Sequence, residues 1–253
     1  MTQIIAVLNH KGGVGKSTTA VSLAAALQLS KKNVLAIDMD GQANLTEALG
    51  LSIEEEQTVY GAMCGQYTLP LVKLHNGITV SPSCLDLSAA ELELISEPGR
   101  ELILKGIITK AIAKEHFDYI IIDCGLKQEL LTVNALSASD YCIIPVQSHF
   151  LASEGIPDVL DMVCSVQKHF NLGLKIAGIL LTMYQSRLQL CKSVQQSVRE
   201  IYGDDLHVFD RPIEYTIRIA ECPMAGMSIL DYEPGNPAAE SYRNLASEVL
   251  RLG

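Results

Sequence analysis

The residues best suited to chemistry in this chain are two lysines and a serine set around a run of glycines. Lys16 and Ser17 follow the glycines, and Lys11 precedes them. Glycines let backbone N–H groups converge on phosphate oxygens, and a helix N-terminus adds its positive dipole end. A lysine brings charge to the outer phosphates, and a serine hydroxyl can ligate Mg²⁺. The pattern predicts a phosphate-binding loop made of Lys11, Gly12, Gly13, Val14, Gly15, Lys16, Ser17 and Thr18.

Lys11 is the unusual member of this loop. The ordinary pattern G-x-x-x-x-G-K begins with a glycine, and His10 stands at that position here. A lysine at the start of the loop cannot easily fold back onto phosphates held by its own chain. We therefore expect Lys11 to reach a nucleotide held by a second copy of the protein.

Three aspartates end apolar runs that read as buried strands. Asp38 and Asp40 follow residues 34–37, and Asp123 follows residues 119–122. Alternate positions at a strand end point to the same side, which places the first two carboxylates together. Beside a phosphate loop, such carboxylates suit Mg²⁺-bound water and an attacking water. Asp123 stands where Mg²⁺ is commonly held through water in proteins with this loop.

Alternating strands and helices must position these groups. Continuous apolar strands between helical runs are typical of a doubly wound, mostly parallel β-sheet with helices on both faces, an α/β fold. The chain shows no repeat, linker or low-complexity stretch, so residues 1–253 are expected to form a single domain. The pattern predicts strands at 3–9, 34–37, 78–83, 119–123, 141–146 and 175–183, and helices at 17–30, 85–95, 99–115, 153–170, 188–202 and 237–252, with one or two more helices within 51–67.

Composition limits the possible environments and partners. The seven cysteines occur singly, so neither a zinc site nor a redox dithiol is indicated, and no apolar run is long enough to span a bilayer. We expect a reducing cytoplasm. The net charge of −10 argues against a constitutively basic nucleic-acid binder, although it allows a local basic patch assembled in a dimer.

Several motifs resemble the ParA/MinD group of P-loop ATPases, and most closely the short ParA/Soj proteins. The loop matches that group's pattern K-G-G-x-G-K-[ST]. Residues 38–44 resemble D-x-D-P-Q-G-N, with Gly41 and Ala43 replacing the proline and the glycine. Residues 123–129 begin like D-C-P-P-S-L-G, but Gly125 and Leu126 replace both prolines. Because this pair is freer in its backbone angles, we expect the segment after Asp123, switch II, to be more mobile than in the family.

The resemblance implies the activity and the roles of particular residues. It implies slow, Mg²⁺-dependent ATP hydrolysis, with ATP and Mg²⁺ held by the loop. Asp40 would orient or activate the attacking water, and Asp38 would support the Mg²⁺ shell. By analogy with a loop that the family uses, Pro212 or Tyr215 would flank the adenine.

The resemblance also implies partners. Two protomers would close on two ATP molecules as a homodimer, which would bind DNA without sequence preference through Arg187 and Arg218. A ParB-like partner would stimulate hydrolysis, and the protein would be cytoplasmic and associated with the nucleoid, where it would drive plasmid or chromosome partition.

Other members of the group leave alternatives open. A protein-handling or metallochaperone ATPase, or a protein that positions protein cargo or serves a conjugative element, could carry the same loop. A membrane-recruited ATPase needs a basic amphipathic end, whereas residues 244–253 hold one base and one acid, so no stable membrane association is expected. An electron carrier that shares an iron–sulfur cluster between protomers would need a cysteine soon after Asp123, and residues 130–138 contain none.

Overall fold

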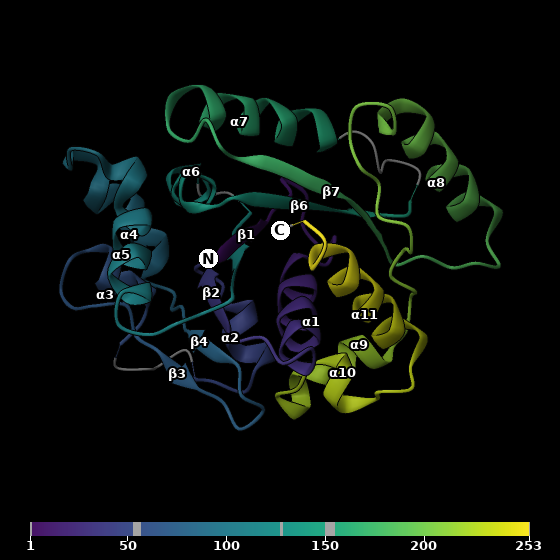
Figure 1. Ribbon diagram of the computed structural model, residues 1–253, viewed down its shortest axis with the longest axis horizontal. Helices are drawn as coiled ribbons and strands as arrows, with labels where there is room; N and C mark the ends of the chain where they lie inside the picture. The colour runs from purple at the N-terminus through teal and green to yellow at the C-terminus, as the bar shows by residue number, and fades with distance from the viewer. Residues whose placement is uncertain (1, 53–56, 127–128, 150–154, 253) are drawn as a thin grey trace.

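A seven-stranded sheet forms the centre of the molecule (Figure 1). The computed structural model describes residues 2–52, 57–126, 129–149 and 155–252. The strands are β1 (Gln3–Val7), β2 (Val34–Met39), β3 (Val72–Lys73), β4 (Thr79–Ser81), β5 (Tyr119–Cys124), β6 (Tyr141–Gln147) and β7 (Lys175–Thr182). They lie in the order β3-β4-β2-β5-β1-β6-β7, and only the β3–β4 pair is antiparallel. The predicted doubly wound, mostly parallel sheet is confirmed.

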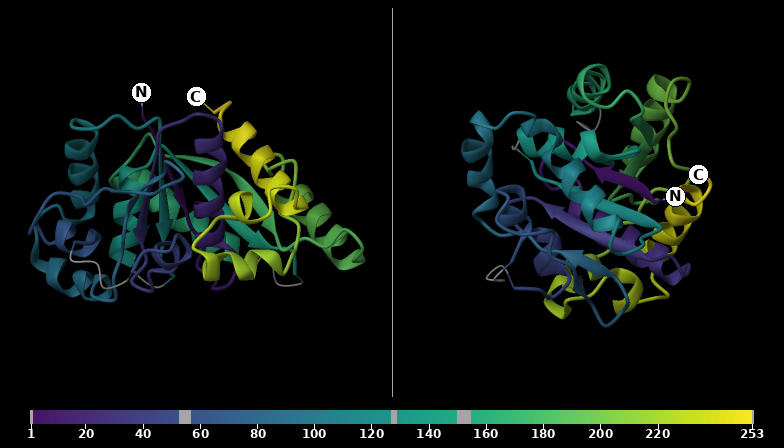
Figure 2. Two further views of the ribbon diagram at one scale, coloured as in Figure 1. Left: turned by 90° about the horizontal axis from the view of Figure 1, so that it is seen from below. Right: turned by 60° about the vertical axis from the view of Figure 1, so that its left-hand side comes forward.

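Helices cover both faces of this sheet (Figures 1 and 2). One hydrophobic core includes side chains of α1 (Lys16–Leu29), α2 (Asn44–Ala48), α10 (Ile229–Tyr232) and α11 (Pro237–Val249), and short α9 (Arg218–Glu221) packs against it. The core on the other face includes side chains of α3 (Val59–Met63), α4 (Leu87–Glu93), α5 (Ile103–Ile112), α6 (Glu129–Ala138), α7 (Ile156–His169) and α8 (Gln189–Tyr202).

The continuous apolar strands follow from this two-sided burial. All six residues of β5 are buried, and successive side chains alternate between the two cores. Ile120 and Ile122 join the core beneath α3–α8, whereas Tyr119 and Ile121 join the core beneath α1 and α11. A strand with only one buried face would instead alternate apolar and polar residues.

The structure differs from the predicted elements in several places. The helix predicted over 99–115 begins as a 3₁₀ turn at Arg100–Leu102 before α5, because buried Asn134 accepts a hydrogen bond from the Leu104 N–H and donates one to the Arg100 carbonyl. The helix predicted over 85–95 likewise ends in a 3₁₀ turn, Leu94–Ser96. Within 51–67 the described residues form only α3, and edge strand β3 was not predicted. The predicted start of the helix over 153–170 falls at residues 153–154, which lie outside the described part.

Strand order brings the chemically capable residues to one edge of the sheet. β1 leads into the glycine loop and α1, and it lies between β5 and β6. Asp38 and Asp123 are register partners on β2 and β5, and Asp123 also pairs with Val7 of β1. Ligands of doubly wound sheets bind at the carboxyl ends of such strands. In the described ranges, no helix is long and apolar enough to cross a bilayer.

Candidate functional site

The loop between β1 and α1 needs glycine at two of its positions. Gly13 has φ of 72° and Gly15 has φ of 86°, a left-handed conformation that costs little only for glycine. Gly15 is also the residue that precedes α1, so the first N–H groups of the helix face the loop. The loop therefore presents backbone donors and a helix dipole to an anion, as its sequence predicts.

Three side-chain contacts hold this loop to the neighbouring strands. The Thr182 hydroxyl donates to the Val14 carbonyl oxygen at 2.8 Å from the end of β7. Asn9 donates to the Pro145 carbonyl oxygen at 2.7 Å and accepts from the Lys11 N–H at 2.9 Å. Sequence reasoning missed both Thr182 and Asn9. The signal that could have found them is a polar residue closing an otherwise apolar strand.

The two lysines of the loop lie close together. The Lys16 ammonium donates to the Lys11 carbonyl oxygen at 3.3 Å, and Lys16 is buried. The Lys11 side chain packs beside Gly155, where an added Cβ would lie 3.2 Å from Lys11 Cγ and 3.3 Å from Asn9 Oδ1. Gly155 therefore leaves the room that the Lys11 methylenes occupy.

Asp123 is a carboxylate at the end of β5, deep in the sheet. It is fully buried, and neither of its oxygens is hydrogen-bonded to the described residues. Burial raises the pKa of Asp123 well above its usual value, and the charge of Asp38 raises it further, whereas the Ser17 hydroxyl and Lys16 lower it. Two unpaired oxygens beside a serine hydroxyl fit the ligand preference of Mg²⁺, directly or through water.

Asp38 is equally buried, but it is fully engaged. One oxygen accepts from the Thr46 N–H at 2.9 Å and the Thr46 hydroxyl at 2.7 Å, and the other accepts from the Asp40 N–H at 3.1 Å. Burial raises the pKa of Asp38 to about 6, against the lowering effect of these hydrogen bonds. In this structure Asp38 anchors the segment that carries Asp40. Thr46, which the sequence did not single out, completes that anchor.

Asp40 lines the main cavity of the site. Its side chain accepts a hydrogen bond from the Gln42 N–H at 3.0 Å, and its carbonyl accepts one from the Ser83 hydroxyl at 2.8 Å. The cavity has a volume of about 480 Å³. Its lining includes Gly12, Gly13, Gly15, Lys16, Ser17, Thr18, Asp40, Gln42, Asn44, Glu47 and Leu126.

A second, more apolar cavity of about 300 Å³ adjoins the first. Tyr215 and Ile217 line it, whereas Pro212 is not part of its lining. Of the two residues expected beside an adenine, the structure brings only Tyr215 to this cavity. The residues that line both cavities are Gly15, Thr18, Met183, Ile219 and Pro223.

The segment after Asp123 is described only in part. Leu126 lines the main cavity and lies opposite Gly12, where an added Cβ would be 3.5 Å from its Cδ2. Lys127 and Gln128 lie outside the described residues, so the expected mobility of switch II stays a prediction. Among the described residues, no group of three acidic, histidine or cysteine side chains could hold a metal ion. Mg²⁺ at Ser17 and Asp123 would thus need phosphate or water ligands as well.

The two arginines expected to contact DNA differ in their surroundings. Arg218 pairs with Glu221 at 2.8 Å and with Glu233 at 3.4 Å. Arg187 is exposed between β7 and α8, and it has no ion pair with any described residue. Of these two arginines, Arg187 alone has no described acidic side chain that offsets its positive charge.

Comparisons with known proteins identify the family of the chain. A family model described as an AAA domain matches residues 2–176. The chain is 40% identical over 257 residues to the sporulation initiation inhibitor protein Soj of Bacillus subtilis, covering 100% of both. It is 36% identical to the chromosome partitioning protein ParA of Myxococcus xanthus, covering 98% of this chain and 88% of that protein.

Solved structures show the same likeness. Cobyrinic acid a,c-diamide synthase from Mycobacterium smegmatis, with bound ADP and magnesium, is 34% identical with a TM-score of 0.87, covering 99% of this chain and 95% of that one. The septum site-determining protein MinD of Pyrococcus horikoshii, complexed with Mg-ADP, is 25% identical with a TM-score of 0.79, covering 100% and 97%.

The parallel sheet, the glycine loop and the buried carboxylates together define a P-loop ATPase. Within this class of ATPases, the chain is 40% identical to the Soj protein and 36% identical to the ParA protein over almost its whole length. The chain belongs to the ParA/Soj family of partition ATPases.

Proposed function

We propose that this chain is a single-domain ATPase, spanning residues 1–253, that drives plasmid or chromosome partition through an ATP-dependent dimer. The observation that carries the proposal is the meeting of Lys16, Ser17 and Asp40 around one cavity, with Asp123 buried beside Ser17 and Lys16. Lys11 adjoins this group through its carbonyl oxygen, which accepts a hydrogen bond from the Lys16 ammonium. The loop binds the phosphates of ATP, and the adjoining apolar cavity, with Tyr215, takes the adenine. Its relatives in the ParA/Soj family support the same function.

Each residue of the site has a distinct task in this proposal. Lys16 and the loop N–H groups neutralise the phosphates, and Ser17 and Asp123 hold Mg²⁺, which offsets the negative charge that develops in phosphoryl transfer. Asp40 orients the attacking water, and Asp38 holds Asp40 in place through the hydrogen bonds of residues 38–46. Lys11 reaches the phosphates held by the facing protomer.

In this proposal, dimerisation makes DNA binding depend on bound ATP. Two protomers double any basic surface, which matters for a chain of net charge −10. The dimer binds DNA without sequence preference on the nucleoid in the cytoplasm, with Arg187 contributing directly. A ParB-like partner accelerates hydrolysis, which opens the dimer and releases DNA.

The test measures ATP binding and the oligomeric state of the protein with ATP. Lys16→Ala should lose ATP binding in calorimetry. Light scattering should show an ATP-dependent dimer for Asp40→Ala, because hydrolysis is blocked, and a monomer for Lys11→Ala. Monomers in both cases would exclude the sandwich dimer, and unchanged ATP affinity in Lys16→Ala would exclude the loop as the nucleotide site.

Positioning of protein cargo is the second candidate, and the pairing of Arg218 favours it. Two glutamates already compensate this arginine, so the expected DNA surface is weaker than the sequence suggests. If the ATP-bound Asp40→Ala dimer shows no DNA affinity at low salt, cargo positioning becomes the better function.

A further inference from the structure

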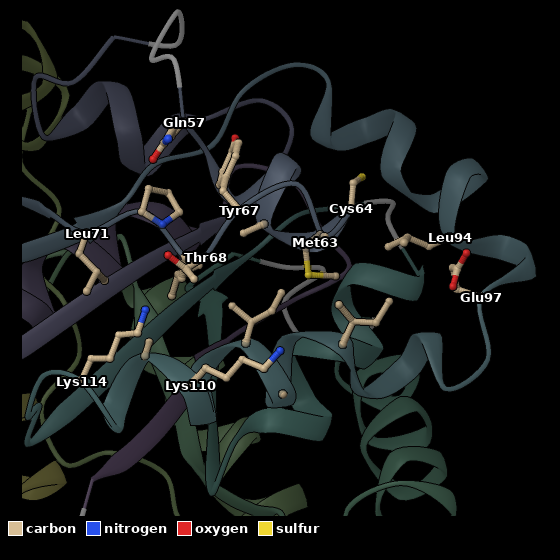
Figure 3. A pocket seen from close by; sticks show the side chains of 18 of the residues that line it. Gln57, Met63, Cys64, Tyr67, Thr68, Leu71, Leu94, Glu97, Lys110 and Lys114 are labelled. Carbon is tan, nitrogen blue, oxygen red and sulfur yellow. The ribbon is translucent and has the colours of Figure 1, made fainter.

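A larger cavity lies away from the nucleotide site. It has a volume of about 870 Å³ and lies between the segment 62–71, the turn after α4 and one side of α5 (Figure 3). None of its lining residues also lines the cavity at the glycine loop. Its floor includes Met63, Leu69 and Leu94, which belong to the core beneath α3–α8. This groove is therefore open to a ligand that never touches the nucleotide.

One face of α5 forms a wall of the groove, and its apolar side chains pack against the core without being fully covered. Ile103 and Ile107 are only partly buried there, one helical turn apart. Gly106 lies beside them in the helix interior, where glycine is destabilising relative to alanine. An added Cβ at Gly106 would meet nothing within 4 Å, so packing within the described chain does not require this glycine. A glycine on an open helix face lets another backbone approach closely.

Charge is distributed unevenly along the groove. Residues 103–114 contain three lysines and no acid in a chain of net charge −10. Lys110 and Lys114 line the end near the C-terminus of α5, and neither has an ion pair with a described residue. Exposed Glu97 lies at the opposite end, as Figure 3 shows. Glu93, also in the lining, already accepts hydrogen bonds from Tyr60 and Cys64.

We propose that this groove binds an amphipathic helix of a partner protein, running antiparallel to α5, with an acidic first turn. Acidic side chains are favoured in the first turn of a helix, and here they would meet Lys110 and Lys114. The basic last turn of the same helix would meet Glu97. Its apolar stripe would cover Ile103 and Ile107, and a small residue would cross Gly106. The binding requires neither nucleotide nor DNA, so it goes beyond the proposed function.

Two synthetic peptides test the proposal. Both have the same composition and the same leucine and alanine stripe, but one begins with glutamates and ends with lysines and the other has these ends exchanged. Fluorescence anisotropy with the full chain should show about tenfold tighter binding of the peptide with the acidic first turn. The double variant Lys110→Glu with Lys114→Glu should reverse this preference. The control, Lys192→Glu with Arg199→Glu on the exposed face of α8, should leave it unchanged.

Gly106 supplies an independent test that does not alter charge. Gly106→Leu should weaken binding of the preferred peptide about tenfold by filling the groove, whereas the fold, checked by circular dichroism, and ATP affinity stay as in the wild type. Equal binding of both peptides, no binding of either, or wild-type peptide affinity in Gly106→Leu would overturn the proposal. So would a nucleotide-independent dimer that Gly106→Leu abolishes, because a second copy of this chain would then occupy the groove.

Discussion

Single atoms around Lys11 set how precisely that side chain is held. Replacing Gly155 by alanine would place a Cβ 3.2 Å from Lys11 Cγ, although the backbone there, with φ of −93°, accepts alanine. We expect Gly155→Ala to weaken the ATP-dependent dimer several-fold and to leave ATP affinity unchanged, because the new Cβ crowds Lys11 and Asn9 rather than Lys16 and Ser17. Light scattering over a protein dilution series measures the first and calorimetry the second. Gly173→Ala, whose new Cβ would lie 3.7 Å from its nearest neighbour, is the matched control.

Asp123 is a second residue, one where stability and the proposed function have opposite requirements. A buried carboxylate with no hydrogen bond from the described residues opposes folding when it is ionised. Asp123→Asn should therefore stabilise the nucleotide-free protein by about 1–3 kcal/mol while abolishing Mg²⁺-dependent hydrolysis. Because the folded-state pKa is raised, both states are protonated at low pH and the wild-type penalty is absent there, so the gain should grow as pH rises from the unfolded-state pKa of about 4 toward the folded-state pKa and level off above it. Thermal unfolding at several pH values tests this, and a gain that shrinks toward alkaline pH would contradict it.

At the scale of elements, α4 holds the start of α6, the helix that follows switch II. Glu91 accepts a hydrogen bond from the Leu130 N–H at 2.8 Å and a longer one from the Leu131 N–H at 3.4 Å. Glu91→Ala would leave the first N–H groups of α6 without this acceptor. It should cost about 0.5–2 kcal/mol of unfolding free energy and lower ATP turnover, because the segment between Asp123 and α6 loses its fixed end. Urea unfolding and a phosphate-release assay measure the two effects.

Glu91→Gln is the matched control, since its carbonyl oxygen can still accept these hydrogen bonds. It should lose less stability and less turnover than the alanine variant. Equal losses in both variants would show that the charge of Glu91 matters rather than its position. Turnover that stays at the wild-type level in Glu91→Ala would separate α4 from switch II.

The same elements show what the sequence could and could not predict. The core strands and the loop were predictable because local patterns determine them: continuous apolar runs specify buried strands, and left-handed turns require glycine at Gly13 and Gly15. Contacts between distant residues were not predictable. Asn134 divides the helix over 99–115 through hydrogen bonds spanning about 30 residues, and Thr46 engages Asp38. The ion pair between Arg218 and Glu233 could not be predicted either, because it also depends on the folded chain.

At the scale of the whole molecule, the net charge of −10 would make the proposed DNA binding depend on few cationic side chains. Arg187 has no ion pair with a described residue, whereas Arg218 would have to exchange Glu221 and Glu233 for phosphate. Exposed ion pairs are worth about 0–1 kcal/mol each, so this competition weakens the contact without preventing it. Arg187→Glu should therefore reduce the DNA affinity of the ATP-bound Asp40→Ala dimer more than Arg218→Glu does, and Glu233→Gln should increase it.

Fluorescence anisotropy with random duplexes over a salt series separates these effects. In a plot of the logarithm of the DNA-binding constant against the logarithm of salt concentration, each phosphate contact contributes a slope of about −0.9. Losing Arg187 from both protomers should therefore make the slope less steep by about two. Arg251→Glu, a change of equal charge near the end of the chain, is the control for the effect of net charge alone. If it reduces affinity and slope as much as Arg187→Glu does, the overall field of an acidic protein governs binding, and Arg187 is not a contact.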